Sequence, residues 1–492
     1  MIPLFLLLAC TGRHADDTAH DTAGPAGRAF PAGFTWGASM AGFQVDPGCP
    51  TLPAEQCEDR NSDWYVWVTD PELVAESGNH LSGQALSDGP GHWELYDQDL
   101  ARAADELHLG GVRNSFEWSR LFPSDPGPVH TVDELAQHAD PTAVAAYHAW
   151  LQSAHDHGLQ PIMTLNHYTI PTWLHDAKGC HQDLSTCLNK GWVDHDRMIE
   201  QISLYAGFCA REFGPEVDDW LTENEPLAVV LSGYLMPTED RTNPPGVVDP
   251  EAAFAVMLTQ IEAHAAMYDQ IHAEDPVARV GAALNLAAVT PKDPADALDQ
   301  ASVEHFDYLY NRVFLNAAVN GEWDANLDGV VDQVRDDLMG RMDFIGINYY
   351  TQVTVDGLGF QLFDQSPLFD FLPSGALDTV YPAGMDEVVT EAASYDLPII
   401  ITENGSAGVA DATNDALLPH LSALADAMDA GAVVEGYFYW SLIDNYEWNH
   451  GMALKFGLYD VDVATKARSL RQVGADYAEI ARTNTLPEPA GG

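Results

Sequence analysis

The stretch PIIITENG, residues 398–405, decides the fold. Three consecutive isoleucines after Pro398 predict a strand, and the lack of polar alternation predicts that both faces are buried, as in a parallel sheet covered by helices. The strand delivers the carboxylate of Glu403, and Asn404-Gly405 favours a turn. Because α/β folds hold their chemistry at the carboxyl ends of parallel strands, Glu403 is a candidate catalytic residue. A glutamate in a surface turn is the alternative.

Similar strand-like segments recur along the chain and alternate with helical patterns. The strands are predicted at 34–39, 112–119, 160–168, 218–226, 279–285, 343–350, 398–404 and 434–441. The clearest helices are predicted at 94–109, 140–157, 195–213, 251–274 and 414–430. Because no Gly-rich phosphate loop follows the first strand, this alternation favours a single α/β domain, a closed (β/α)8 TIM barrel, over an open doubly wound sheet. The segments 46–92, 120–139, 170–192, 226–250, 286–333 and 351–383 are predicted to be long insertions, most of them over the carboxyl ends of the strands.

The composition excludes several functions. The formal net charge of −54 over 492 residues argues against nucleic-acid binding and against electrostatic adhesion to an anionic bilayer. The 46% hydrophobic content, which includes 12 Trp, 18 Tyr and 18 Phe, is enough for a large core and for a lined cleft. The acidic surface suits a saline habitat, and a merely solvated acidic surface is the alternative.

The N-terminus resembles a targeting segment. Ile2 to Ala9 form an apolar run that is too short to span a bilayer, and Leu7-Leu8-Ala9-Cys10 resembles a bacterial lipoprotein signal, so residues 1–9 are predicted to be a signal peptide. We therefore expect export and lipidation at Cys10, with the protein anchored at the bacterial cell envelope, periplasmic or surface-exposed. The acidic segment 10–29 is predicted to be a disordered tether, residues 30–482 the catalytic domain, and residues 483–492 a flexible tail.

The cysteines agree with an exported protein. Two close pairs, Cys49/Cys57 and Cys180/Cys187, lie in loop-like segments and are predicted to form local disulfides. Their spacing is too wide for a four-cysteine metal site. Cys209 lies in an apolar helical pattern and is predicted to be a buried thiol.

Polar and aromatic side chains follow every predicted strand. A second carboxylate, Glu225 in TENEP, is presented in the same way as Glu403. The others include Gln44, Arg113, His167, Asn224, Asn285, Asn348, Tyr350, Trp440, Glu447 and Trp448. Amides, carboxylates and indoles bind hydroxyl groups and stack on the apolar faces of sugar rings, so these strand ends predict a carbohydrate site. The histidines lack the spacing of metal ligands.

From Phe30 to Arg482 the chain resembles glycoside hydrolase family 1, the β-glucosidase and β-galactosidase family. The motifs that carry the resemblance are FPAGFTWGAS, AGFQ, VRNSFEWSRLFP, TLNHYTIPTWL, TENEP, DFIGINYY, ITENG and GYFYWSLIDNYEW, in the family's order. The segment EDRNSDWYVWVTDPE at 58–72, together with the AGFQ and TLNHY variants, is most similar to the archaeal β-glycosidase branch.

The resemblance implies a retaining β-glycosidase that needs no cofactor. Glu403 would be the ionised nucleophile and Glu225 the acid/base, with their carboxyl groups about 5–5.5 Å apart. Arg113 and Tyr350 would support the nucleophile, which is expected to have a normal or lowered pKa. Asn224 would bind the sugar 2-hydroxyl. The remaining substrate-binding positions are implied to be Gln44, His167, Tyr350, Trp440, Glu447 and Trp448.

Three residues depart from the family pattern. Glu223 replaces an apolar residue in TENEP and, as the strand neighbour of Asn224, is expected to point away from the site. Asp46 stands where a Glu usually follows the glycone Gln, and Tyr168 replaces the common Trp beside His167, which leaves the preferred glycone open. Asn449 and Phe456 do not match the Ser and Tyr of the phospho-glycosidase branch, so a 6-phosphosugar substrate is not expected.

Two further questions stay open in the sequence. Hydrolysis of β-glucosides or β-galactosides is the leading function; a membrane-tethered transglycosylase acting on sugar or glycolipid acceptors and a non-catalytic sugar-binding protein are the alternatives. Separately, Asp324, Asn326, Asp328, Gly329 and Asp332 copy the first nine positions of an EF-hand-type calcium loop, but Arg335 occupies position twelve. A structural Ca²⁺ site and an acidic surface turn are both compatible with this pattern.

Overall fold

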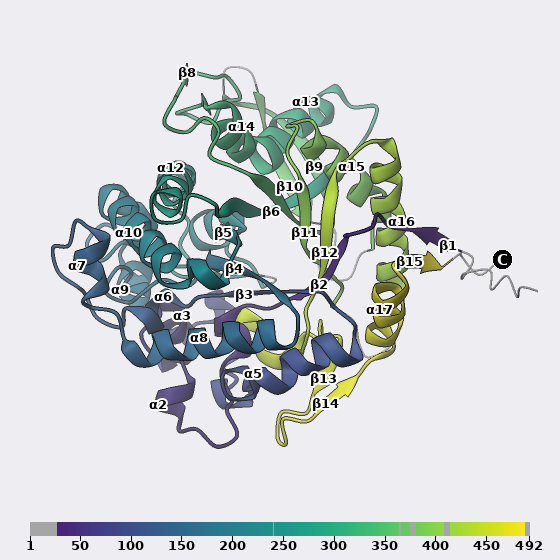
Figure 1. Cartoon of the computed structure of the whole chain (residues 1–492). Coiled ribbons are helices and arrows are strands. Elements are labelled where there is room, and N and C mark those ends of the chain that lie inside the picture. Colours follow the sequence, from purple (N-terminus) through teal and green to yellow (C-terminus); the bar gives the residue numbers. More distant parts are fainter. Residues whose placement is uncertain (1–26, 240, 364–365, 374–379, 408–413, 488–492) are drawn as a thin grey trace, which may run out of the picture.

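A closed barrel of parallel strands forms the centre of the computed structural model, which describes residues 27–239, 241–363, 366–373, 380–407 and 414–487. In these residues eight strands pair in the cyclic order β2-β3-β4-β5-β6-β9-β11-β12, and β12 pairs with β2 to close the ring (Figure 1). Their bounds are β2 Thr35–Ser39, β3 Gly111–Ser115, β4 Gln160–Asn166, β5 Asp219–Asn224, β6 Arg279–Pro291, β9 Phe344–Phe363, β11 Ile399–Asn404 and β12 Val434–Trp440. The predicted (β/α)8 barrel is therefore confirmed.

The opening stretch of the sequence forms the strand that it predicts. Every residue of β11 is buried. Its alternate side chains serve two different cores: Ile399 and Ile401 pack in the large cluster between strands and helices, whereas Ile400 belongs to a separate cluster with residues of β4, β5, β6, β9 and β12. Burial on both faces explains why the sequence of this strand shows no polar alternation.

The second cluster fills the barrel below its carboxyl end. It consists of Ile162, Leu221, Ala283, Phe344, Ile400 and Phe438, one residue from each of the strands just named. A β-carbon on Gly37 would lie 2.3 Å from the Phe438 ring, so glycine at that position makes room for the phenylalanine. The polar residues of the site therefore rest on a packed apolar floor.

Helices surround the barrel (Figure 1). The predicted segments correspond to α5 His92–Ala101, α8 Pro141–Asp156, α10 His195–Phe213, α12 Pro250–Glu274 and α16 Asn414–Ala430. Helix α8 shows how the sequence sets a start: Asp140 accepts hydrogen bonds from the amides of Thr142 and Ala143, and Pro141 occupies the first turn. Further helices were not predicted; the longest of them are α13 Ala297–Asp307, α14 Val313–Asn320, α15 Pro382–Ala393 and α17 Gln472–Thr483.

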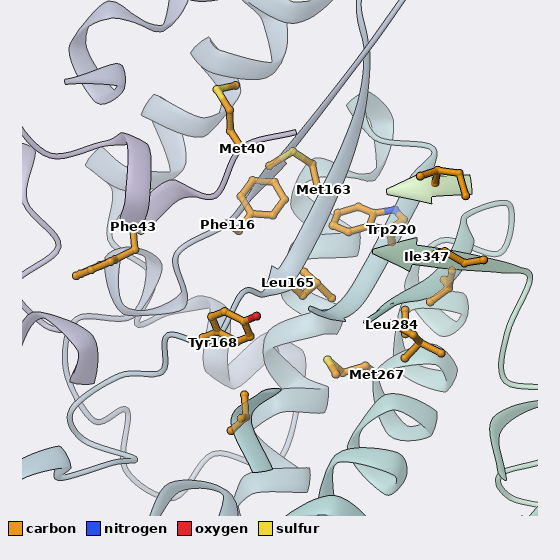
Figure 2. Packing of buried hydrophobic residues seen from close by; sticks show 14 of the residues in the cluster. Met40, Phe43, Phe116, Met163, Leu165, Tyr168, Trp220, Met267, Leu284 and Ile347 are labelled. Atoms are coloured by element: carbon orange, nitrogen blue, oxygen red, sulfur yellow. The ribbon is translucent and has the colours of Figure 1, made fainter. Parts of the chain in front are cut away.

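The large cluster joins the strands to these helices. Figure 2 shows part of it, including Met163 of β4, Trp220 of β5 and Met267 of α12. Trp220 is fully buried. Packing of this kind fixes the strands that carry the site residues.

Strand ends were predicted less well than strand positions. Strand β6 runs to Pro291 and β9 to Phe363, where the sequence predicted ends at 285 and 350. Beyond the barrel the two extensions pair with each other, and β9 also pairs antiparallel with β10 Ser366–Pro373. Ala287, Val353 and Val355 pack with Phe306 there, which explains why the strands continue past their polar residues. The segments 286–333 and 351–383 are thus only partly loops. Conversely, β3 ends at Ser115, and Trp118–Leu121 forms the short helix α6.

The two ends of the described chain meet. Strand β1, Gly27–Ala29, pairs antiparallel with β15, Thr485–Pro487. The predicted tether (10–29) and tail (483–492) therefore each include a strand, and the folded unit extends past residues 30–482 on both sides. Residues 1–26, with Cys10 and the apolar run, lie outside the described residues.

Both predicted disulfides are present. Cys49 and Cys57 are joined by an S–S bond of 2.03 Å, and Cys180 and Cys187 by one of 2.08 Å. Cys209 is a buried free thiol, as predicted. None of the helices that the structure describes has the length and apolar character needed to cross a bilayer.

Candidate active site

A cavity of about 180 Å³ opens at the carboxyl ends of the barrel strands. The catalytic and substrate-binding residues predicted from the sequence all line it: Gln44, His167, Asn224, Glu225, Tyr350, Glu403, Trp440, Glu447 and Trp448. Arg113, also predicted, is fully buried and bonded to Glu403. The barrel therefore brings together residues from all along the chain.

A sharp change in backbone direction positions the side chain of Glu225. It follows β5 with a left-handed φ of 47°, and Pro226 then begins the short helix α11, Pro226–Val230. The αR conformation is disfavoured before a proline, and the left-handed region is unfavourable for glutamate. Local strain of this kind is common where surrounding structure holds a functional side chain in place.

Glu403 is held by a cation and a hydroxyl. Arg113 Nη1 donates to Oε1 at 2.5 Å, and the Tyr350 hydroxyl donates to Oε2 at 2.6 Å. The carboxylate is only 3% exposed. An ionised glutamate in this position has its negative charge paired and both oxygens bonded.

Arg113 connects Glu403 to the neighbouring strands. Its Nη2 donates to Asn224 Oδ1 at 2.6 Å, and its Nε donates to Thr164 Oγ1 at 3.1 Å. Asn348 Nδ2 donates to the same Asn224 oxygen at 3.0 Å. The side-chain amide group of Asn224 is thereby oriented with its NH₂ toward His167, at 3.3 Å from Nε2.

Glu225 has neutral partners instead. Asn348 Nδ2 donates to Oε1 at 2.9 Å, and the Tyr168 hydroxyl is hydrogen-bonded to Oε2. In the part of the chain that the structure describes, no lysine or arginine is bonded to this carboxyl group. The two catalytic candidates thus differ in their partners although both are buried.

Burial raises the pKa of Glu403 to about 7. The Arg113 guanidinium and the Tyr350 hydroxyl lower it, and the Glu225 carboxyl raises it further. The expected normal or lowered pKa is therefore wrong, because loss of solvent outweighs the two donors. Burial, with Arg113, also lowers the pKa of His167 well below its usual value, so His167 is neutral at pH 7.

Several buried polar atoms that line the cavity have no hydrogen-bond partner among the described residues. They are Gln44 Oε1, His167 Nδ1 and Arg241 Nη1. Because Asn224 donates to His167 Nε2, the proton of the neutral ring lies on Nδ1. The cavity therefore presents one free acceptor and two free donors. Unpaired buried groups of this kind are what a polyhydroxyl ligand would satisfy.

Several contacts on one side of the cavity converge on Glu447. Gln44 Nε2 donates to its Oε2 at 2.8 Å, and Arg241 Nη2 donates to its Oε1 at 3.2 Å. Nearby, the imidazole of His167 lies parallel to Trp440 and to Trp448, with interplanar angles of 13° and 14°. Flat aromatic faces beside hydroxyl-binding groups suit a sugar ring.

Sequence reasoning missed Arg241 and gave no role to Asn348 or Tyr168. Arg241 lies in the insertion after β5, and its guanidinium sits 5.7 Å from the centroid of Tyr168 and 6.0 Å from that of Trp448. The only signal was an arginine in an insertion of a strongly acidic chain. Asn348 stood at a predicted strand end, and Tyr168 was noted only as a departure from the family.

The other departures lie outside the cavity. Asp46 faces Arg120, with 3.3 Å between the charged atoms, and it does not line the site. Glu223 is 1% exposed, and neither of its oxygens has a hydrogen-bond partner in the described chain. The expectation that Glu223 points away from the site agrees with its absence from the cavity lining.

The segment that resembles a calcium loop forms a self-contained turn. Asp324 accepts hydrogen bonds from the amides of Asp328 and Gly329, and Asp332 accepts one from the amide of Ala325. Asn326 Nδ2 donates to Asp328 Oδ2 at 3.1 Å. Within the described ranges, no group of three or more histidines, cysteines or acidic residues is arranged to hold a metal ion. These contacts favour the acidic-turn interpretation.

Comparisons with known proteins agree with this geometry. The family model described as Glycosyl hydrolase family 1 matches residues 26–486. The chain is 33% identical to a β-galactosidase of Pyrococcus woesei, over 92% of this chain and 97% of that protein, and 32% identical to a β-galactosidase of Saccharolobus solfataricus, over 93% and 96%. The crystal structure of the β-glycosidase from Thermosphaera aggregans superposes with a TM-score of 0.82 at 29% identity, covering 94% of this chain and 98% of that one.

Proposed function

This chain belongs to glycosyl hydrolase family 1 and is a retaining β-glycosidase, and we propose that Glu403 is its nucleophile and Glu225 its acid/base. The observation that carries this assignment is the pairing of Arg113 with Glu403 at 2.5 Å, whereas Glu225 is bonded by an amide and a phenol. A guanidinium stabilises the charged form that a nucleophile needs. Neutral partners suit a group that must both give and take a proton.

In the first step a carboxylate oxygen of Glu403 attacks the anomeric carbon as the bond to the aglycone oxygen breaks. Glu225 gives its proton to that oxygen, so the aglycone leaves as a neutral alcohol. The sugar is left as an ester of Glu403, and Glu225 is ionised. Asn224, oriented by Arg113, supports the sugar 2-hydroxyl.

In the second step Glu225 takes a proton from a water molecule, and the water oxygen attacks the anomeric carbon. The bond to Glu403 breaks, and its carboxylate returns to the guanidinium of Arg113. Two inversions give net retention at the anomeric carbon. Both catalytic groups are carboxyls, so the two steps require no cofactor.

Trapping and substitution test the two roles separately. A 2-deoxy-2-fluoro β-glycoside with a good leaving group should label Glu403, identified by peptide mass. Glu225→Gln should reduce kcat/KM for a 4-nitrophenyl β-glycoside by about 10²–10⁴-fold. The same variant should retain first-step rates on a 2,4-dinitrophenyl glycoside, whose leaving group needs no proton. Label on another residue, or unchanged hydrolysis of the 4-nitrophenyl substrate, would contradict the assignment.

The glycone is proposed to be a terminal neutral hexose in a β-glucoside or β-galactoside. The unpaired atoms of Gln44, His167 and Arg241, with Glu447, offer donors and acceptors to several hydroxyls. The two relatives from Pyrococcus woesei and Saccharolobus solfataricus are named β-galactosidases. A panel of aryl β-glucoside, β-galactoside, β-fucoside and β-mannoside ranks the glycones, and equal rates on all four would contradict a site that binds each hydroxyl.

Export and lipid anchoring at Cys10 are also part of this proposal. The two local disulfides support an oxidising compartment, since such bonds are rare in the reducing cytosol. Expression in a bacterial host, with radiolabelled palmitate and cell fractionation, tests the anchor: wild type should be labelled and found at the envelope, and Cys10→Ser should lose the label. Unlabelled wild type in the soluble cytosolic fraction would refute it.

A further inference from the structure

Tyr168 contacts the acid/base in a way that the two-step reaction leaves unexplained. Its hydroxyl is hydrogen-bonded to Glu225 Oε2, the oxygen that Asn348 does not bond. Both oxygens of the acid/base are therefore occupied before substrate enters. No other hydroxyl of the described residues is bonded to this carboxyl group.

The protein holds the Tyr168 ring firmly. The side chain is 4% exposed, and its backbone has a left-handed φ of 72°, an unfavourable value for tyrosine. The rings of Tyr168 and Trp448 pack edge to face, with 4.9 Å between their centroids, and the guanidinium of Arg241 lies over the Tyr168 ring. The hydroxyl cannot leave Glu225 without breaking these contacts.

A phenol suits both protonation states of its partner. Burial, with the neighbouring Glu225 carboxyl, raises the pKa of Tyr168 well above its usual value, so the hydroxyl stays protonated. It can accept a proton from the carboxylic acid or donate to the carboxylate. The bond to the ionised form is the stronger one, because it is charge-assisted.

We propose that Tyr168 is a positioning residue for the acid/base, whose hydroxyl holds Glu225 Oε2 throughout the cycle and favours the ionised carboxylate that the second step requires. This inference rests on the proposed role of Glu225. It assigns a purpose to the residue that replaces the family's common tryptophan beside His167, since an indole cannot make this bond in the same manner.

Other charged or titratable groups also face Glu225 and must stay constant in a test. They are Glu403 of β11, Tyr350 of β9, Tyr310 of the helical turn Tyr308–Arg312, Arg241 of the insertion after β5, and Glu447 after β12. Tyr168→Phe leaves all of them in place and keeps the ring between Arg241 and Trp448. The change therefore isolates the hydroxyl.

Two pH profiles of Tyr168→Phe report on Glu225. For kcat/KM on a 4-nitrophenyl glycoside, Glu225 must be protonated, so loss of the hydroxyl should move the alkaline limb to higher pH by about one unit. For kcat on a 2,4-dinitrophenyl glycoside, where the second step limits and Glu403 is esterified, Glu225 must be ionised. The acidic limb of that profile should move to higher pH by a similar amount. Tyr168→Trp should shift both limbs in the same direction.

The controls separate this inference from the proposed function. Tyr439→Phe removes the hydroxyl of another buried barrel tyrosine, which has no hydrogen-bond partner in the described structure, and should leave both profiles unchanged. If Tyr168→Phe matches wild type in both profiles while Glu225→Gln is deficient, the inference fails and the proposed function stands. If Glu225→Gln hydrolyses the 4-nitrophenyl substrate like wild type, the acid/base assignment itself fails.

Discussion

Glu223 should destabilise the folded protein, and replacing it should stabilise the fold in a pH-dependent way. Its side chain is 1% exposed, and neither oxygen has a hydrogen-bond partner among the described residues. Burial raises its pKa well above the ordinary value of 4.5. A buried carboxyl group without partners costs free energy even when neutral, about 1–3 kcal/mol from mutational data on polar groups.

The pH dependence follows from proton binding. Above pH 4.5 the unfolded chain loses the Glu223 proton, while the folded protein keeps it because its pKa is raised. The unfolded state then binds fewer protons, so stability falls as pH rises, by about 1.4 kcal/mol per pH unit, until the folded-state pKa is reached. Glu223→Gln removes only this pH-dependent loss of stability, whereas Glu223→Leu also removes the cost of burying a polar group.

Urea denaturation followed by tryptophan fluorescence measures both terms. Between about pH 5 and pH 6, the free energy of unfolding of Glu223→Gln relative to wild type should rise by about 1.4 kcal/mol. Glu223→Leu should exceed Glu223→Gln by a roughly constant amount of about 1–3 kcal/mol. Glu304→Gln, at an exposed position, should show no such slope. A flat difference between wild type and Glu223→Gln would mean that Glu223 is ionised or paired in the folded state.

Three further predictions concern the site and the surface. Tyr350→Phe removes a hydroxyl donor that lowers the pKa of Glu403, so that pKa should rise above about 7. The acidic limb of the kcat/KM profile should then move to higher pH. If this limb does not move, Glu403 is not the group whose ionisation it reports. Arg241→Met should lower kcat/KM by about 10–100-fold, since it removes a charge-assisted bond to Glu447 and a free donor, while the exposed Arg60→Met should not. Raising NaCl from about 0.1 M to about 1 M should raise the melting temperature, because salt screens the repulsion among the acidic groups that give the net charge of −54. An unchanged melting temperature would show that this repulsion does not destabilise the fold.

The sequence predicted what short-range patterns encode. Strand β11 followed from its isoleucines, the helix α8 from its periodicity, and Glu225 and Glu403 from their places at strand ends. These features depend on neighbouring residues and on the geometry shared by all (β/α)8 barrels. The predicted cavity residues were found for the same reason, because each one lies at or after the carboxyl end of a predicted strand.

Features that depend on contacts between distant segments were not predictable. The extension of β9 to Phe363 depends on pairing with β6 and β10, for which the sequence of β9 alone gives no signal. Arg241 reaches Glu447 across 206 residues of chain, from an insertion without a periodic pattern. The pKa of Glu403 depends on how far burial outweighs Arg113 and Tyr350, a balance that only the folded structure defines.

Burial alone could not have assigned the two catalytic roles, because Glu225 and Glu403 are 6% and 3% exposed and each is bonded to a tyrosine hydroxyl. The asymmetry comes from Arg113, whose guanidinium is bonded to Glu403 and to Asn224. One cation therefore stabilises the charge of the proposed nucleophile and orients the amide that is proposed to bind the sugar 2-hydroxyl. Because the same group serves both, a change at Arg113 should reduce nucleophile ionisation and substrate orientation together, and it cannot be used to measure either one alone.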